Sequence, residues 1–229
     1  MFKKILTICP TRQRSKVCQR MFDSFLMTSS QSDIIFVLDD NDPYLQDYGF
    51  IFKNPANFVI GSQTSITKVF NTIFTQNPDY EFYHLTNDDF VYQTVGWDKI
   101  FIDKLINKGG GIAYGNDLCV GQGLCTAPVI SGDIVRAIGW LQLPALTHLY
   151  GDVVWKLIGH RIDRLFYFKD VIIEHRHTMN GKAEIDDIYK KTNSKEMYQK
   201  DDQAFGEWLI KQSHWDIEKI KQCFKGVGV

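Results

Sequence analysis

The alternation of short apolar segments with amphipathic helical ones is the feature that most constrains how this chain can fold. Residues 4–9 form an apolar segment closed by Pro10, residues 15–28 carry apolar side chains at helical spacing, and residues 33–38 form a second apolar segment. A strand, a helix and a strand over so short a length imply two parallel strands joined by a right-handed crossover. The start of the chain therefore predicts an α/β fold.

The same alternation continues to residue 177. We expect further strands at 57–60, within 81–90, and at 112–115, 126–130 and 166–173, and helices at 64–76, 96–107, 132–140 and 151–160, with a loop at 141–150. Residues 180–229 are more polar and mostly helical. We therefore predict a mostly parallel central sheet with helices on both faces in residues 1–178, and a helical C-terminal extension in residues 179–229 that packs on or covers the active site.

Three of the predicted strands end in side chains that can bind a metal ion or a nucleotide. Asp39 and Asp40 follow the second strand, Asp88 and Asp89 follow the fourth, and His175 and His177 follow the last. An isolated acidic pair at a strand end is more often a solvated cap. Because the carboxyl ends of parallel strands meet at one edge of a sheet, three such ends together favour a nucleotide and metal site. Carboxylate oxygens suit Mg²⁺ or Mn²⁺, and imidazole nitrogens favour Mn²⁺.

Composition bounds the class of protein. The chain has 229 residues, 44% of them hydrophobic, so it can bury a substantial core. Its net charge of -1 provides no global field for nucleic acid or an anionic membrane, although a local basic groove is compatible with it. The five cysteines form no CxxC pair and fit a reducing compartment. No stretch approaches the length of a transmembrane helix, and we expect a cytoplasmic protein.

Several segments together resemble family 2 glycosyltransferases of the GT-A fold. The first strand and its loop, Ile8-Cys9-Pro10-Thr11-Arg12-Gln13-Arg14, resemble the opening of that family. Val37-Leu38-Asp39-Asp40 is similar to its second strand, Leu85-Thr86-Asn87-Asp88-Asp89 to its DxD metal motif, and Gly151-Asp152 to its late acidic motif. Residues 174–193 also resemble glycosyltransferases encoded by bacteriophages, which would place the protein in the host cytoplasm. The order and spacing of these pieces carry the resemblance.

The resemblance implies a GT-A, Rossmann-like nucleotide-sugar site with a bound Mn²⁺ or Mg²⁺. Asp89 is the expected metal ligand, with His175 or His177 completing the metal shell. For each histidine, a backbone hydrogen bond is an equally good interpretation. The residues expected to bind the nucleotide sugar are Pro10, Thr11, Arg12, Arg14, Asp39, Asp40, Asn87, Asp88 and Lys182. Asn87 is neutral, so the site brings less charge to the metal than a full Asp-x-Asp motif.

Two of these assignments have strong structural alternatives. The family order implies that Asp152 is the catalytic base that deprotonates an acceptor hydroxyl. An Asp at a helix start is also a common N-cap. Lys182 lies in a glycine-flanked loop and could close over a diphosphate, whereas most lysines are simply solvated.

These residues predict a metal-dependent glycosyltransferase that moves a sugar from a nucleotide diphosphate sugar to a hydroxyl, with inversion if Asp152 is the base. The alternatives are a nucleotidyltransferase and a noncatalytic module that binds a nucleotide sugar or a carbohydrate. A nucleotidyltransferase usually has a glycine-rich loop after its first strand, and residues 10–14 contain no glycine. The sequence leaves open the donor base, the sugar, the oligomeric state and the choice between inversion and retention, since retaining enzymes of this fold can also have a histidine at the metal. The acceptor is open too, with a modified DNA base or a glycan as acceptor classes.

Overall fold

The computed structural model describes residues 3–53 and 57–224. The start of the predicted segment 1–178, residues 1–2, and the end of the predicted segment 179–229, residues 225–229, lie outside the described residues. Strands in this part of the chain form one sheet in the order β3-β2-β1-β4-β7-β6-β8-β5. The strands are β1 (Lys3–Thr11), β2 (Ser32–Asp39), β3 (Asn57–Gly61), β4 (Tyr80–Leu85), β5 (Phe90–Tyr92), β6 (Ile112–Asn116), β7 (Val129–Ser131) and β8 (Leu165–His175). Among them, β5 and β7 run antiparallel to their neighbours, and the others share one direction. The prediction of a mostly parallel sheet is confirmed.

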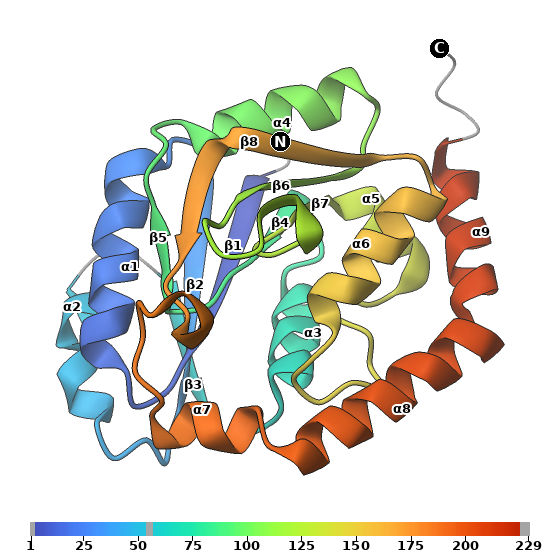
Figure 1. Cartoon of the computed structure of the whole chain (residues 1–229). Helices are drawn as coiled ribbons and strands as arrows, with labels where there is room; N and C mark the ends of the chain where they lie inside the picture. Colours follow the sequence, from blue (N-terminus) through green and yellow to red (C-terminus); the bar gives the residue numbers. More distant parts are fainter. Residues whose placement is uncertain (1–2, 54–56, 225–229) are drawn as a thin grey trace.

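Helices cover both faces of the sheet (Figure 1). They are α1 (Ser15–Thr28), α2 (Gly49–Phe52), α3 (Ile66–Gln76), α4 (Trp97–Asn107), α5 (Gly132–Ile138), α6 (Gly151–Arg161), α7 (Asp187–Thr192), α8 (Lys195–Lys211) and α9 (Ser213–Phe224), with short 3₁₀ helices η1 (Leu45–Tyr48), η2 (Gly121–Gly123) and η3 (Thr178–Asn180). One core cluster joins α1 and α4 to the sheet through side chains such as Phe22 and Trp97. A second cluster joins α3, α5 and α6 through Phe70, Ile134 and Trp155. The two clusters place apolar helix faces on opposite sides of the strands.

The C-terminal helices form a band along the lower and right-hand margins of the molecule as drawn (Figure 1). Trp208 of α8 and Ile217 and Ile220 of α9 belong to the same core cluster as α5 and α6. The Trp208 indole donates a hydrogen bond to Asp216 at 2.8 Å, which satisfies its N–H inside the core. Within residues 3–53 and 57–224, no helix is both long and apolar enough to cross a membrane.

The structure corrects several predicted boundaries. β1 does not stop at Pro10 but continues to Thr11, with Pro10 paired to Val37. Proline suits this position because its fixed φ is compatible with an extended chain and the missing N–H matters least at a strand end. The predicted strand at 126–130 is shorter and shifted in β7, and β5 was not predicted. The helix predicted at 132–140 ends at Ile138 because Gly139 adopts a left-handed conformation with φ of 80°.

β8 contains an irregularity where it passes β6. Gly115 pairs with Phe168, whereas the next β6 residue, Asn116, pairs with Ile172. One step along β6 thus corresponds to four steps along β8, which bulges by three extra residues. A side chain at Gly115 would meet the Val171 carbonyl oxygen at 2.5 Å. Glycine is therefore required where the bulge crosses its neighbour.

Candidate active site

The carboxyl ends of β1, β2, β4 and β8 meet at one edge of the sheet, as predicted, and bring Asp89 and His175 into contact. The Asp89 Oδ2 lies 3.5 Å from the His175 Nε2. Pairing of Phe90 with His175 between β5 and β8 fixes this approach, and the Arg176 N–H donates to the Asp89 carbonyl at 2.9 Å. The His175 ring also stacks on Phe90, with centroids 4.4 Å apart. Residues far apart in the chain are thus held together by strand register.

Asp89 has the properties expected of a metal ligand. Its Oδ1 is buried and has no hydrogen-bond partner among the described residues. Burial alone would raise the pKa of Asp89, but the hydrogen bond and charge of His175, with Arg14 beyond, lower it overall. The carboxyl group is therefore ionised at neutral pH, with one oxygen aimed at no protein donor.

The described residues contain no preformed group of three His, Cys, Asp or Glu side chains able to hold a metal ion. Asp89 and His175 provide two donors, which fits Mg²⁺ or Mn²⁺ bound mainly through substrate phosphates and water. The His177 ring centroid lies 4.8 Å from that of His175, and its Nδ1 accepts a hydrogen bond from the Met179 N–H at 3.2 Å. The backbone alternative proposed for this histidine is thus realised at Nδ1, which leaves Nε2 for any ligand.

Asp88 points into the protein rather than toward His175. Its Oδ2 accepts a hydrogen bond from the Thr11 hydroxyl at 2.8 Å, and its Oδ1 lies 3.6 Å from the Arg14 guanidinium. Burial, followed by the neighbouring charge of Asp89, raises the pKa of Asp88 to about 7. Two adjacent carboxylates thus have opposite pKa shifts, and Asp88 links the loop after β1 to the end of β4.

Among the residues predicted to contact the nucleotide, Arg12 and Asp39 contact each other, whereas Asp40 and Asn87 lie apart from this pair. The Arg12 guanidinium donates to Asp39 at 2.9 Å and to Asn41 at 2.6 Å. Asp40 is exposed, and its carboxylate accepts from the Ser62 hydroxyl at 3.3 Å. Arg12 and Asp39 thus form one ion pair at the end of β2, with Asp40 directed away from it. The side chain of Asn87 is half-buried, and none of the hydrogen bonds recorded for the described residues involves it.

Arg14 and Lys182 are both held by carboxylates. Arg14 donates two hydrogen bonds to Asp186, at 2.7 and 2.8 Å, which join the loop after β1 to the N-cap of α7. Lys182 forms an ion pair with Glu174 at 2.5 Å. Contact between Lys182 and a diphosphate, as predicted, would require this ion pair to open.

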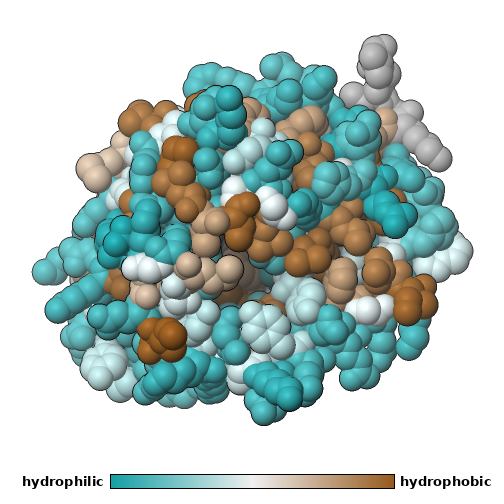
Figure 2. All heavy atoms as spheres, viewed as in Figure 1, coloured by the Kyte–Doolittle hydropathy of each residue, from teal (hydrophilic) through white to brown (hydrophobic). Residues whose placement is uncertain are grey.

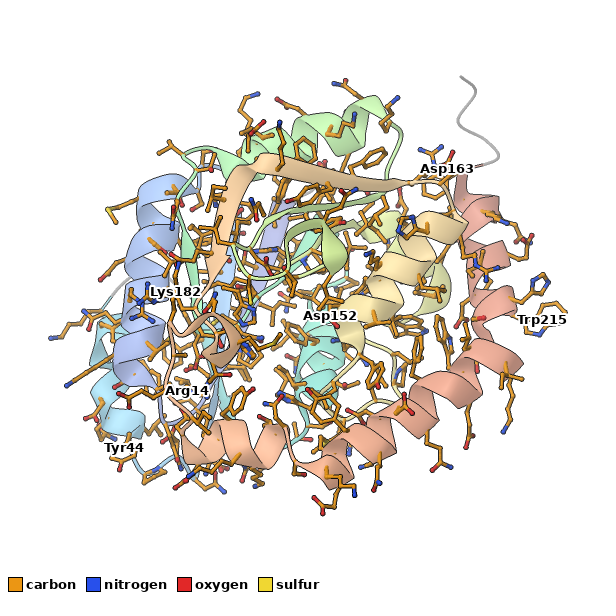
Figure 3. All side chains as sticks on the ribbon, in the orientation of Figure 1. Arg14, Tyr44, Asp152, Asp163, Lys182 and Trp215 are labelled. Carbon is orange, nitrogen blue, oxygen red and sulfur yellow. The ribbon has the colours of Figure 1, made fainter. Side chains whose placement is uncertain are left out.

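Asp152 lies in the first turn of α6, across the central region of this face from Arg14 and Lys182 (Figure 3). The same face is hollowed near its centre (Figure 2). The N-cap of α6 is Tyr150, so the alternative of an N-cap role for Asp152 is wrong. The Asp152 Oδ1 accepts a hydrogen bond from the Val153 N–H at 2.8 Å. Burial raises the pKa of Asp152, against the smaller effects of the backbone N–H groups of Val153 and Asp152 and of the charge of His175.

Several residues at this edge were not predicted. Asp117, at the end of β6, accepts hydrogen bonds from the N–H groups of Cys119, Val120 and Gly121 and from the Thr126 hydroxyl. The rule applied to the other strands, a carboxylate directly after an apolar run, would have found it. Asp186 is the N-cap of α7 and Asp201 lies in α8, and no pattern in this polar part of the sequence distinguishes them from solvated acids.

Comparison with solved structures identifies the fold. The chain is similar to TarS 1-349 of S. aureus in complex with UDP-GlcNAc, with a TM-score of 0.63 and 11% identity over 95% of this chain and 70% of that chain. It is also similar to the mannosyltransferase PcManGT of Pyrobaculum calidifontis in complex with GDP-Man and Mn²⁺, with a TM-score of 0.57 and 11% identity over 98% and 76% of the two chains. No protein-family model and no curated protein sequence matches.

A second TarS 1-349 structure, in complex with UDP, has a TM-score of 0.60 and 10% identity over 74% of this chain. The match spans 59% of that chain, and 43% of a longer TarS chain, so the present protein corresponds to part of those proteins. At such low identity the likeness establishes the fold. The chain has the GT-A fold, as its sequence resemblance predicted.

Proposed function

We propose that this protein is a metal-dependent glycosyltransferase that moves a sugar from a nucleotide diphosphate sugar to an acceptor hydroxyl, with inversion at the anomeric carbon. The observation that carries the proposal is the buried Oδ1 of Asp89, which has no hydrogen-bond partner in residues 3–53 and 57–224 and lies beside His175 at the carboxyl edge of a GT-A sheet. Buried carboxylate oxygens are normally hydrogen-bonded, so a bound ligand is the expected partner of this atom.

Asp89 and His175 would hold Mn²⁺ or Mg²⁺, with His177 as a further candidate through Nε2. When bound, such an ion neutralises charge on the departing diphosphate. The nucleoside would lie against the end of β1, at Pro10 and Thr11, and beside the ion pair of Arg12 with Asp39. The other residues that we propose to bind the nucleotide sugar are Asp40, Asn87, Asp88, Arg14 and Lys182.

Asp152 is the proposed base. Burial raises its pKa, which makes its carboxylate a better proton acceptor than a solvated aspartate. The proton of the acceptor hydroxyl passes to this carboxylate as the hydroxyl oxygen forms a bond to the anomeric carbon. The bond from that carbon to the diphosphate oxygen breaks on the opposite face, and the nucleoside diphosphate leaves with the electron pair. Attack from one face and departure from the other inverts the centre.

The acceptor class belongs to the same proposal, with a modified DNA base and a glycan as the two alternatives that the sequence resemblance offered. A cytoplasmic location, in a phage host if the narrower resemblance is correct, is consistent with the five cysteines, all of which are unpaired. We also retain the division into a catalytic part, 1–178, and a C-terminal extension. The contact of Arg14 with Asp186 and the packing of α8 support an extension that covers the site.

The test is Asp89→Asn, which removes the charge but keeps the size of the side chain. UDP-GlcNAc and GDP-Man, each with Mn²⁺, serve as donors, and release of UDP or GDP is measured with and without added glycan and DNA acceptors. We expect the variant to lose at least about 100-fold in turnover, because a lost electrostatic contact to a developing charge costs about 10²–10³ in kcat.

Asp163→Asn is the matched control, since Asp163 is exposed and follows the far end of α6 from Asp152 (Figure 3). It should turn over donor at the wild-type rate. Full activity of Asp89→Asn would refute the metal assignment. Release of pyrophosphate from a nucleoside triphosphate supplied with a sugar 1-phosphate, without release of nucleoside diphosphate from the donors, would identify a nucleotidyltransferase. Donor binding without any turnover would identify a noncatalytic module.

A further inference from the structure

A cavity of about 530 Å³ lies between α6, the first half of β8 and the 3₁₀ helix η2. Lys156 and His160 of α6, Tyr167 of β8 and Gln122 of η2 line it, together with Tyr114 of β6. None of these residues belongs to the site described above. The volume falls within the range of pockets that bind small molecules. The cavity can therefore hold a small ligand or one part of a larger one.

One wall of the cavity, α6, begins at the proposed base. Asp152, Lys156 and His160 follow one another at intervals of four residues, so they lie on the same face of the helix, about 6 Å apart along its axis at each step. Asp152 lies at the start of α6, and Asp163 follows its far end (Figure 3). A ligand in the cavity would thus lie beside α6, one to two turns from Asp152.

A second wall, η2, is anchored at the proposed metal site. The Asp117 carbonyl accepts a hydrogen bond from the His175 N–H at 2.9 Å. The Asp117 carboxylate accepts one from the N–H of Gly121, the first residue of η2, at 2.7 Å. Asp117 therefore links the strand end that carries His175 to the rim of the cavity. The cavity thus lies next to the candidate active site.

Lys156 brings a positive charge to the cavity. Its Nζ donates to the carbonyl oxygens of Gln122 and Gly123, at 3.1 and 2.5 Å, and none of the ion pairs within residues 3–53 and 57–224 involves it. An ammonium group has three N–H donors, so one remains for a ligand. His160, one turn further on and exposed, adds a ring nitrogen that can donate. These groups favour a ligand with a negative charge.

The rest of the lining is mainly aromatic and uncharged. The ring centroids of Tyr114 and Tyr167 lie 5.1 Å apart, and the Tyr114 hydroxyl donates to the Gln122 carbonyl at 3.2 Å. A tyrosine ring with its hydroxyl suits a ligand that has apolar faces and polar edges, as a sugar ring has. Among the described residues that line the cavity, none is acidic.

A nucleic acid fits this lining less well than a charged sugar does. DNA binding depends on many basic contacts along the phosphates. Two basic side chains in one cavity, in a chain of net charge -1, do not provide such a track. The lining therefore favours a saccharide that carries a negative group.

We infer that this cavity is an acceptor subsite that binds a saccharide carrying a carboxylate or a phosphate, with Lys156 holding the negative group and Tyr167 contacting the sugar ring. The inference rests on the proposed function and names the acceptor class that it left open. A hydroxyl of the same or of the neighbouring sugar unit would then reach Asp152, one turn of α6 from the bound charge.

The first test measures binding alone, by NMR titration without donor or metal. Glucose, glucuronate and glucose 6-phosphate serve as probes, because they share one ring and differ in the group at C6. We expect the wild-type protein to bind the two anions about 10-fold more tightly than glucose, as for one charge-assisted hydrogen bond. Lys156→Gln should remove this difference, and Lys219→Gln, at an exposed lysine of α9, should keep it.

Comparison of neutral and charged probes separates ligand binding from the role of Lys156 in holding η2. A looser η2 would weaken the binding of all three probes alike, whereas loss of the bound charge weakens only that of the two anions. Lys156→Arg keeps the charge and should bind the anions more tightly than Lys156→Gln does. Equal affinities for the three probes in the wild type, or equal weakening of all three in Lys156→Gln, would overturn the inference. Tighter binding of a single-stranded DNA oligonucleotide than of any saccharide, lost in Lys156→Gln, would overturn it in favour of a nucleic-acid site.

The second test is kinetic and uses the proposed reaction, with UDP-GlcNAc or GDP-Man and Mn²⁺ as donor system and glucuronate or glucose 6-phosphate as acceptor. Lys156→Gln should raise the acceptor KM about 10-fold and leave the donor KM unchanged. A rise in the donor KM instead would place Lys156 with the nucleotide and overturn the inference.

The inference and the proposed function fail in different ways. Charge-dependent binding in a protein that transfers no sugar would refute the proposed function, and the acceptor role with it, and leave a saccharide site. Sugar transfer without charge-dependent binding would refute the inference alone.

Discussion

His84 of β4 gives a pH dependence whose size can be worked from the structure. It is fully buried just before the candidate site, with Nδ1 3.1 Å from the Pro128 carbonyl and Nε2 2.8 Å from the Tyr92 hydroxyl. Burial lowers the pKa of His84 to about 4, against smaller opposing effects of the Pro128 carbonyl and Asp98. The folded state therefore holds this ring neutral at pH values where a solvated histidine takes up a proton.

The sign follows from proton uptake by the unfolded chain. Above pH 6.5 His84 is neutral in both states. Between pH 6.5 and about 4 the unfolded chain binds a proton that the folded protein does not, so the free energy of unfolding falls as the pH falls, and it levels off below pH 4. At 1.36 kcal/mol per pKa unit, the loss from this residue is about 3 kcal/mol. That is a large fraction of the stability of a typical domain.

The assay is urea unfolding of the wild type and of His84→Gln at pH 7 and pH 4. Other groups titrate over this range in both proteins, so the informative quantity is the difference between their two pH dependences. We expect the loss of unfolding free energy on acidification to be about 3 kcal/mol smaller in His84→Gln. Equal pH dependences, or an NMR titration of His84 near pH 6.5 in the folded protein, would refute this reasoning.

Three further substitutions test the packing and the C-terminal extension. Gly132→Ala places a methyl group against the Tyr80 carbonyl oxygen and should cost about 1–3 kcal/mol in urea unfolding, whereas Gly206→Ala, in α8 with open space around it, should stabilise by up to about 1 kcal/mol. Asp186→Asn removes the charge and one of the two oxygens that accept from Arg14, and should speed protease cleavage within residues 183–193, with little change in unfolding free energy because the pair is partly exposed. Cleavage at the wild-type rate would show that this pair does not hold the segment.

Sequence patterns were enough to predict the regular helices and the edge of the sheet at which the strand ends meet. The contact of Asp89 with His175 followed from one rule, that parallel strands present their carboxyl ends at the same edge. The helix at Ser15–Thr28 was predicted with its observed bounds because its apolar spacing is regular. Acidic pairs were less well resolved: the two members of Asp88-Asp89 face different partners, which depends on the side chains that the folded protein places around each.

What the sequence could not predict depends on contacts between distant segments. β5 spans three residues and exists because β8 pairs with it, so no periodicity marks it. The pairing of Arg14 with Asp186 joins residues that lie 172 positions apart in the sequence. Asp201 differs from its exposed neighbours only in where α8 packs. Lys182 was expected above a diphosphate because it lies in a glycine-flanked loop, but the nearest available anion in the structure is Glu174.

The bulge in β8 determines which of three alternating side chains meets Asp89. Side chains in a strand alternate between faces, so three extra residues, an odd number, reverse the parity of everything that follows. Deleting one residue from the bulge would bring Arg176 to the place of His175 and set a permanent cation against the Asp89 carboxylate. Deleting two would return an imidazole, that of His177, to the same place. Because of the His-Arg-His sequence, the length of this bulge decides whether an imidazole or a guanidinium lies beside the Asp89 carboxylate.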